Sequence, residues 1–342
     1  MASASGSLPR YILQRVLLII PIVWILLSLV FLLLRVAPGD PVTASVGGRL
    51  APEALAERRA ALGLDRPLWQ QYLEYIGNVA RLDFGKTISD NIPVTQVVRD
   101  NGGATLTLAL AALLVALVVG VPLGVLAGRY RDSARDVVIR IFGIITYAAP
   151  VFFVGLLAQL LFAVKLGWFP TSDIATPVTK FQVPPRTHIL LLDAVLDGNT
   201  TAVRDVLLHL VLPAITLGLL LCGVFIRLVR VNMLQTLKGD YVEAARARGL
   251  PERRVLVAYA FRNALVPFVT VLGLQVALLL SGAVLTESTF NWPGLGLKLV
   301  DYIEARDYAA VQGIITLFAV TVVVISLLVD VVNALIDPRI RY

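Results

Sequence analysis

Six long apolar stretches constrain this chain more than any other feature of its sequence. Each holds about 18 or more uncharged, mostly apolar residues, enough for a helix to cross the roughly 30 Å hydrocarbon layer of a bilayer. The windows are Val16–Leu34, Ala104–Gly128, Ile141–Val164, Val206–Ile226, Asn263–Thr286 and Tyr308–Val329. Strands of a membrane barrel alternate apolar and polar residues, and these windows do not. We therefore expect an all-α integral membrane protein with six transmembrane helices.

The composition agrees with this class. Hydrophobic residues make up 58% of the chain and charged residues 15%, against roughly 45–50% and about 25% in soluble domains. The first apolar run is longer than that of a signal peptide, and the Arg35-Val36-Ala37-Pro38 sequence after it is a poor cleavage site. We interpret it as a retained anchor.

The basic residues are concentrated on one side of the membrane and do not form a nucleic-acid-binding patch. With the N-terminus inside, the cytosolic stretches hold 16 Lys and Arg, whereas the two shorter external loops hold six against eight Asp and Glu. This positive-inside asymmetry predicts that both termini are cytoplasmic. No base-reading or stacking groups accompany the cations, so the net charge of +7 does not indicate nucleic acid.

The chain is expected to divide into four segments. These are a disordered tail (1–9), a first transmembrane anchor (10–35), an external loop (36–103) and a core domain with five transmembrane helices (104–342), which includes a cytosolic loop (227–262). Within the external loop, the pattern predicts two short amphipathic helices over the outer mouth. One covers Pro52–Leu64, and Asp65 caps the other, whose apolar face carries Trp69, Tyr72, Leu73, Ile76 and Ala80.

No residues predict catalysis or a bound cofactor. Cys222 is alone inside a span, and His188 and His209 have no partner at metal-ligand spacing. Gly85-Lys86-Thr87 spells the end of a phosphate-binding loop, but Ala80 stands where that loop requires Gly. We expect no enzymatic activity, no metal and no nucleotide on this chain alone.

The cytosolic loop carries a short helix with marked ends. Asp240 is placed to cap it, with Glu243 completing a capping box, and Gly249 suits the left-handed residue that closes a helix. Ala244 and Ala245 keep one surface thin, so that a partner can approach closely.

The pattern Glu243-Ala244-Ala245-x-x-x-Gly249 resembles the signature of bacterial ABC importer permeases, whose corresponding helix docks into a groove on the ATPase subunit. Nearly the whole chain resembles dipeptide/oligopeptide and nickel permeases, most clearly in Asp240–Gly249, Arg262–Pro267, Glu287–Gly296, Arg306–Tyr308 and Asp337–Arg341. The long first external loop and the Asp-Pro-Arg-Ile-Arg ending are similar to the B-type subunit. Pro267 follows Gly249 at a longer spacing than in the general signature, as in the peptide class.

The resemblance implies a type I ABC importer permease in the bacterial inner membrane. Its partners would be a homologous permease in a heterodimer, two ATPase subunits that bind ATP-Mg, and an extracytoplasmic substrate-binding protein. The chain would form half of a pathway for di- and oligopeptides. The implied ATPase-coupling residues are Asp240, Tyr241, Glu243, Ala244, Ala245, Arg246, Arg248 and Gly249. Nickel, glutathione, oligosaccharide or another small solute remain alternative cargoes, and a secondary transporter is the alternative outside this class, although no inverted repeat is visible.

The pathway itself is less readable. Phe290, Trp292, Pro293 and Gly294 could form a re-entrant turn that caps the outer mouth as a gate, or Trp292 could anchor the chain at the membrane surface. Gln159 and Gln275 are polar pathway candidates, with helix–helix hydrogen bonding favoured over substrate contact. Gly120, Gly124 and Gly128 are four residues apart and predict a close helix contact.

Overall fold

The structure is a computed structural model that describes residues 8–36, 52–61, 63, 65–280 and 283–336. Apart from one bridge between Lys86 and Pro93, these residues form helices and loops. The helices are α1 Leu8–Val36, α3 Pro52–Ala61, α4 Leu68–Ala80, α5 Val94–Arg129, α6 Ala134–Ala148, α7 Val151–Ala158, η1 Gln159–Lys165, α8 Pro177–Gln182, α9 Leu190–Leu196, α10 Thr200–Thr236, α11 Asp240–Ala247, α12 Glu252–Arg254, η2 Val255–Phe261, α13 Arg262–Leu280, α14 Val284–Thr289, α15 Leu295–Glu304 and α16 Tyr308–Ile336.

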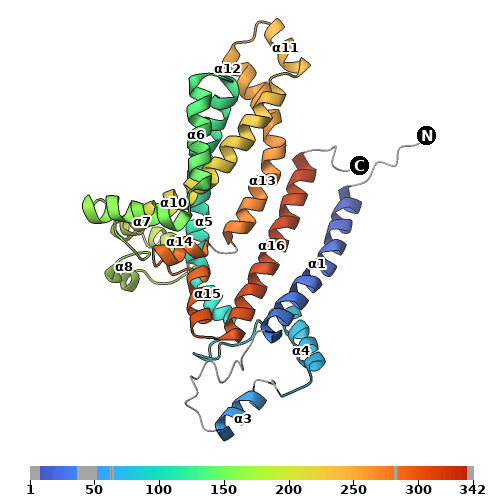
Figure 1. The fold of residues 1–342 in the computed structure, drawn as a ribbon, viewed down its shortest axis with the longest axis vertical. Coiled ribbons are helices and arrows are strands. Elements are labelled where there is room, and N and C mark those ends of the chain that lie inside the picture. Colours follow the sequence, from blue (N-terminus) through green and yellow to red (C-terminus); the bar gives the residue numbers. More distant parts are fainter. Residues whose placement is uncertain (1–7, 37–51, 62, 64, 281–282, 337–342) are drawn as a thin grey trace, which may run out of the picture.

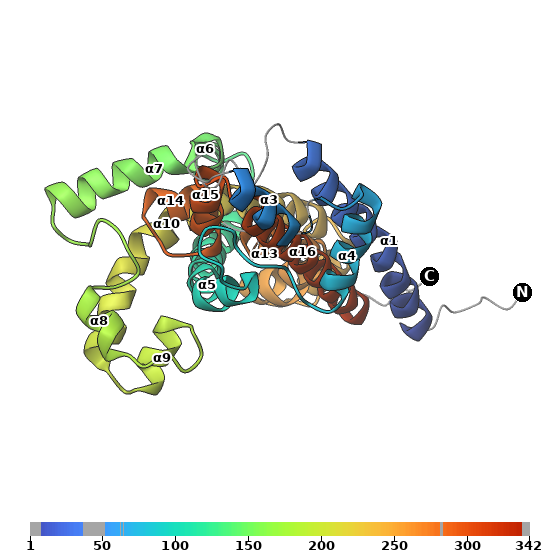
Figure 2. The same cartoon turned by 90° about the horizontal axis from the view of Figure 1, so that it is seen from below.

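The long helices run along one axis of an elongated bundle (Figure 1). The short helix α11 lies at one end of this axis, and α3 and α4 lie at the other. Seen along the axis, α7, α8 and α9 project from one side of the bundle, and α1 forms the opposite side (Figure 2). We call the α11 end the inner end and the α3–α4 end the outer end.

The two longest helices, α5 and α10, form the centre of the bundle. Their contact depends on glycines, because a Cβ on Gly124 would lie 2.7 Å from the Cβ of Val229, and one on Gly128 would lie 2.6 Å from that of Met233. Small residues at every fourth position let two backbones approach closely. The close contact predicted for the glycine triplet is therefore confirmed.

The third apolar window is not one straight span. Its chain bends by 99° between α6 and the α7–η1 arm, at Ala149 and Pro150. Pro150 cannot donate a backbone hydrogen bond and disfavours helix in the residue before it, so the helix ends here. Ala149 accordingly has extended backbone angles. The expectation of a continuous helix over Ile141–Val164 is wrong at this bend.

The fifth window is also divided. α13 ends at Leu280, and Val284 begins the separate helix α14. Within the preceding segment, the axis bends by 54° between Leu265 and Pro267. The described residues thus contain four helices long and apolar enough to cross a membrane, and six spans when each bent pair counts as one. The predicted all-α, six-span class is confirmed, with two of the spans broken.

The outer helices differ from their prediction in two details. α4 begins at Leu68 with Pro67 as its N-cap residue, so Asp65 does not cap it. Tyr72 turns toward α1, where its hydroxyl is 2.7 Å from that of Ser28, and Tyr75 reaches Thr316 on α16. α4 therefore lies against α1 and α16 rather than over the centre of the bundle.

α1 and α16 pack side by side, and the described ends of the chain lie at the inner end (Figure 1). Arg15 on α1 forms an ion pair with Asp330 on α16, with a nitrogen–oxygen distance of 3.1 Å. An even number of crossings follows from this placement of the ends. The predicted disordered tail and the Asp-Pro-Arg-Ile-Arg ending fall largely or wholly outside the described residues.

Candidate functional site

The helix predicted to contact an ATPase forms the tip of the inner end as α11 (Figure 1). Its N-cap residue is Gly239, and no side chain caps the first turn. Asp240 is instead the first helical residue, where its negative charge favours the positive end of the helix dipole. The predicted Asp240–Glu243 capping box is therefore wrong.

The C-terminus of α11 has the geometry that Gly249 predicts. Gly249 has a φ of +73°, its N–H donates to the carbonyl of Arg246 at 2.9 Å, and the N–H of Leu250 donates to that of Ala245 at 3.4 Å. These two bonds define a Schellman motif, which satisfies carbonyls that the helix end would otherwise leave free. The helix ends sharply, and Pro251 is the N-cap residue of α12, which begins at Glu252.

One face of α11 is fixed to its own chain. Val242 and Ala245 are buried and belong to the same apolar cluster as Val255, Leu256 and Ala260 of η2. Ala245 is thus turned away from any partner, contrary to prediction, whereas Ala244 is exposed. Because η2 continues directly into α13, a force on α11 acts on the base of a membrane helix.

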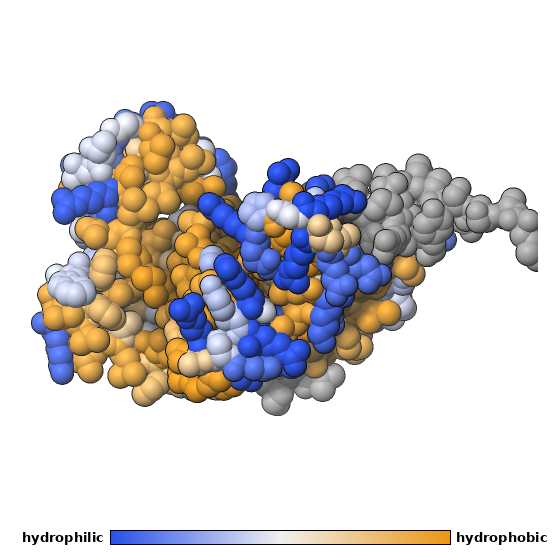
Figure 3. Space-filling model, turned by 90° about the horizontal axis from the view of Figure 1, so that it is seen from above, coloured by the Kyte–Doolittle hydropathy of each residue, from blue (hydrophilic) through white to orange (hydrophobic). Residues whose placement is uncertain are grey.

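The remaining predicted coupling residues lie on the exposed side. Asp240, Tyr241, Glu243, Ala244 and Arg248 are exposed. Arg246 is also exposed but donates two hydrogen bonds to Glu252 at 2.9 and 3.3 Å, and this pairing raises the pKa of Arg246 above its ordinary value. Figure 3, which looks onto the α11 end, shows a group of hydrophilic residues in the middle of the view and mainly hydrophobic residues to the left of it.

A buried ion pair near the inner end was not predicted. Asp136, in the first turn of α6, is fully buried and accepts hydrogen bonds from Nε and Nη2 of Arg230 on α10 at 2.7 and 2.8 Å. The N–H of Asp132 donates to the same carboxylate at 3.0 Å. The two residues are 94 positions apart in the sequence, so no local pattern predicts that they form a pair. Both charges lie next to apolar windows. The pair ties α6 to α10.

At the outer half of the bundle, the predicted gate residues form a tight turn between α14 and α15. Trp292 is fully buried, and its indole N–H donates to the carbonyl of Ala104 on α5 at 2.9 Å. Phe290 is also buried, and its carbonyl accepts a hydrogen bond from the N–H of Asp173. A buried indole cannot lie in the membrane surface, so the anchoring alternative for Trp292 is wrong.

Glu287 organises this turn, although it is not among the predicted site residues. Its fully buried carboxylate accepts hydrogen bonds from the Thr105 hydroxyl at 2.8 Å and the Leu297 N–H at 2.9 Å. A Cβ on Gly294 would collide with this carboxylate, so the glycine makes room for it. Burial raises the pKa of Glu287, while hydrogen bonds from Thr105, Leu297 and Gly296 act in the opposite direction. The cluster fixes the turn to α5.

The two polar pathway candidates differ in their surroundings. The amide nitrogen of Gln159 donates to the carbonyls of Thr171 and Thr289, at 2.7 and 3.0 Å, and so connects the α7–η1 arm to the end of α14. Gln275 lies half-buried on α13. The structure does not bring these residues to one site.

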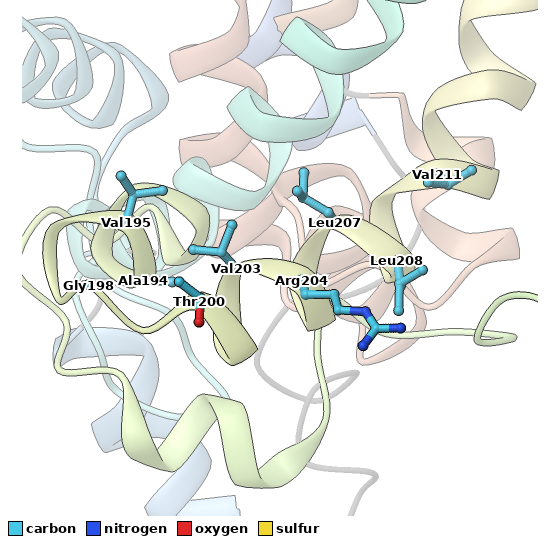
Figure 4. A pocket seen from close by; sticks show the side chains of 9 residues that line it. All are labelled: Ala194, Val195, Gly198, Thr200, Val203, Arg204, Leu207, Leu208 and Val211. Carbon is cyan, nitrogen blue, oxygen red and sulfur yellow. The ribbon is translucent and has the colours of Figure 1, made fainter.

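A cavity of about 400 Å³ lies between α9 and the start of α10 (Figure 4). Its walls are mainly apolar, with Arg204 as the charged member; the others include Ala194, Val195, Val203, Leu207, Leu208 and Val211. None of the predicted site residues lines it. The sites that the structure assembles are therefore an exposed tip at the inner end and a buried turn in the outer half, both connected to the long helices α5, α10 and α13.

Comparison with known proteins identifies the family to which the chain is similar. The profile of the family described as "Binding-protein-dependent transport system inner membrane component" matches residues 120–342, and the profile of its N-terminal region matches residues 8–109. The chain is 41% identical over 333 residues to the "Di/tripeptide transport system permease protein DppB" of Pseudomonas aeruginosa, covering 97% of this chain and 98% of that protein. It is 40% identical to the "Dipeptide transport system permease protein DppB" of Escherichia coli K12 and 32% identical to that of Alkalihalophilus pseudofirmus, each over 97% of this chain and 99% of the relative.

Proposed function

Because the chain belongs to the family of binding-protein-dependent transport system inner membrane components, we propose that it is the permease subunit of an ATP-driven importer of di- and oligopeptides. The observation that supports peptides as the cargo is the similarity, over nearly the full length, to relatives named as di/tripeptide and dipeptide permeases. The chain is a multi-pass inner-membrane protein, and the family works with ATPase subunits and a substrate-binding protein.

The finer assembly is a heterodimer of this chain with a homologous permease, above two ATPase subunits that bind ATP-Mg. Hydrolysis belongs to those subunits, and this chain is not catalytic alone. The exposed side of α11, with Asp240, Tyr241, Glu243, Ala244 and Arg248, provides the docking surface. This assignment places α11 and both termini in the cytoplasm, in agreement with the positive-inside charge distribution.

Coupling requires an element whose position differs between two states of the transporter. α11 meets this requirement, because Val242 and Ala245 hold it on η2, and η2 leads into α13. ATP-driven closure of the ATPases moves α11, and α13 transmits this movement toward the outer half of the bundle. There the turn that contains Phe290, Trp292, Pro293 and Gly294 serves as the outer gate.

Cargo is tested with the complete complex, purified through a tag on this chain and reconstituted with its binding protein. We expect dipeptides to stimulate ATP hydrolysis and to enter the vesicles. Stimulation by nickel or glutathione alone would contradict the peptide assignment while leaving the importer class intact. Absence of any co-purifying ATPase would contradict the assembly.

Sidedness is tested by labelling single cysteines in a Cys222→Ala background. Val195→Cys should react with an impermeant reagent in intact cells, whereas Arg135→Cys and Arg248→Cys should react only after the membrane is opened. All three positions are exposed, so burial does not prevent labelling. External labelling of Arg248→Cys would contradict the proposed orientation.

A further inference from the structure

The outer helix α4 has an apolar flank that no described part of the chain covers. Trp69 and Leu73 are 62% and 60% exposed. They follow the spacing i, i+4, i+7, i+11 with Ile76 and Ala80, which places all four on one side of a helix. This flank is separate from the residues that face the bundle, Tyr72, Tyr75 and Val79.

The depth of α4 follows from its contacts. Arg35 is the first charged residue after the apolar stretch of α1, and a charge at the end of a span marks the hydrocarbon boundary. Tyr72 contacts Ser28 and packs edge-on against Phe31. At 1.5 Å per residue, Ser28 and Phe31 lie about 10 Å and 6 Å from Arg35 along α1, toward the inner end. Tyr75 contacts Thr316, about 12 Å from the start of α16 by the same rise. These contacts lie within the outer ~12 Å of the two spans, so α4 lies in the boundary region, where an amphipathic helix is buried by roughly 5–10 Å.

The membrane-facing surface of α1 continues to the same level. Leu29, Leu32 and Leu33, at its outer end, are 50%, 55% and 69% exposed. The opposite side of α4 carries Gln70, Glu74 and Asn78, and Glu74 pairs with Arg66 at 2.9 Å. The helix thus has three sides: one on the bundle, one apolar and one polar.

We propose that α4 is an interfacial helix whose Trp69–Leu73 flank is inserted in the outer leaflet of the membrane. Tryptophan is enriched at this depth because its ring is apolar and its N–H is polar. The helix then holds the outer ends of α1 and α16 at a fixed depth. This inference depends on α1 and α16 being membrane spans and on the proposed orientation of the chain, and not on the cargo.

The test uses the complete transporter in phospholipid vesicles, with a bimane fluorophore on single cysteines in a Cys222→Ala background. Trp69→Cys and Leu73→Cys report the apolar flank, and Gln70→Cys is the matched control on the polar side. We expect lipids with a nitroxide near the headgroup to quench bimane at 69 and 73 severalfold more than at 70, and aqueous iodide to show the opposite order.

Two results would overturn the proposal. Iodide quenching at 69 and 73 as strong as at 70 would show that the flank faces water, as a docking surface for a soluble protein would. Protection of 69 and 73 from both quenchers would show that another subunit covers it. If Trp69→Cys abolishes assembly, Ala80→Cys, an exposed position on the same flank, decides between these outcomes in the same assay.

Discussion

Replacement of Gly249 by valine isolates the role of the α11 terminus. Gly249 has a φ of +73°, and no atom of the described residues lies within 4 Å of the position that its Cβ would take. The substitution therefore adds backbone strain without a collision inside the chain. A residue with a Cβ costs roughly 1–2 kcal/mol in the left-handed region, and a β-branched residue costs more.

A cost of this size lowers the equilibrium constant for forming the capped conformation by a factor of about 5–30. Because the cap lies in a loop outside the spans, we expect Gly249→Val to insert normally. Peptide uptake should fall by a factor of this order or more, with ATPase subunits either lost on purification or hydrolysing ATP without transport. Gly249→Ala should be milder, and Gly249→Asn milder still, because asparagine tolerates positive φ.

The chain offers a matched control. Gly198 ends α9 with a φ of +69° and the same hydrogen-bond pattern, from Gly198 to Val195 and from Asn199 to Ala194, and it also has no atom near its Cβ position. Gly198→Val imposes the same strain away from α11 and should keep the ATPase subunits bound. Full uptake by Gly249→Val, or equal loss of ATPase from both variants, would refute the coupling role of this cap.

Four further results are expected. Asp136→Asn leaves the guanidinium of Arg230 without its charged partner and should destabilise the complex by about 3 kcal/mol, measured as a lower thermal midpoint. Gly124→Leu forces a side chain into α10 and should cost at least 1–3 kcal/mol, measured as reduced assembly. Trp292→Phe loses one buried hydrogen bond, about 1 kcal/mol, and should raise basal ATPase activity if the turn holds the outer gate closed. Burial raises the pKa of Glu287 from its ordinary 4.5. Its contribution to stability is therefore present at lower pH and is lost as pH rises through the folded-state pKa. Glu287→Gln should reduce this fall of the thermal midpoint with rising pH.

The first three of these changes have a control elsewhere in the chain. Glu74→Gln breaks an exposed pair and should change stability by less than about 1 kcal/mol. Gly77→Leu adds the same side chain where no atom lies within 4 Å of the Cβ position. Trp24→Phe alters an exposed tryptophan and should leave basal ATPase activity unchanged. Equal effects in a variant and its control would point to general destabilisation.

The apolar windows predicted the membrane class because hydrocarbon imposes one strong requirement on composition and length. They did not predict the bend after α6, because proline alone does not decide where a span breaks. Pro122 and Pro213 lie inside the continuous helices α5 and α10, whereas Pro150 stands at a 99° turn. The difference lies in tertiary packing, which the local sequence does not record.

In the candidate sites too, local features could be predicted from the sequence and tertiary contacts could not. The C-terminal cap of α11 was predictable, since a positive φ at Gly249 is a local requirement. Whether Ala245 faces a partner or its own chain depended on the position of η2, a tertiary contact. Glu287 shares a hydrogen bond with Thr105, 182 positions away, and a single sequence contains no signal for such a pair.

The lengths of α5 and α10 have a mechanical consequence. Their 36 and 37 residues extend about 54–56 Å, nearly twice the roughly 30 Å hydrocarbon thickness. α5 meets the Glu287 turn near its outer end, and α10 holds Asp136 near its inner end, so two closely packed rigid rods connect both regions. A tilt of roughly 10° about the midpoint of such a rod displaces each end by about 5 Å in opposite directions. In the mechanism that we propose, a small angular change at the inner end would thereby become a displacement at the outer end comparable to the width of a peptide backbone.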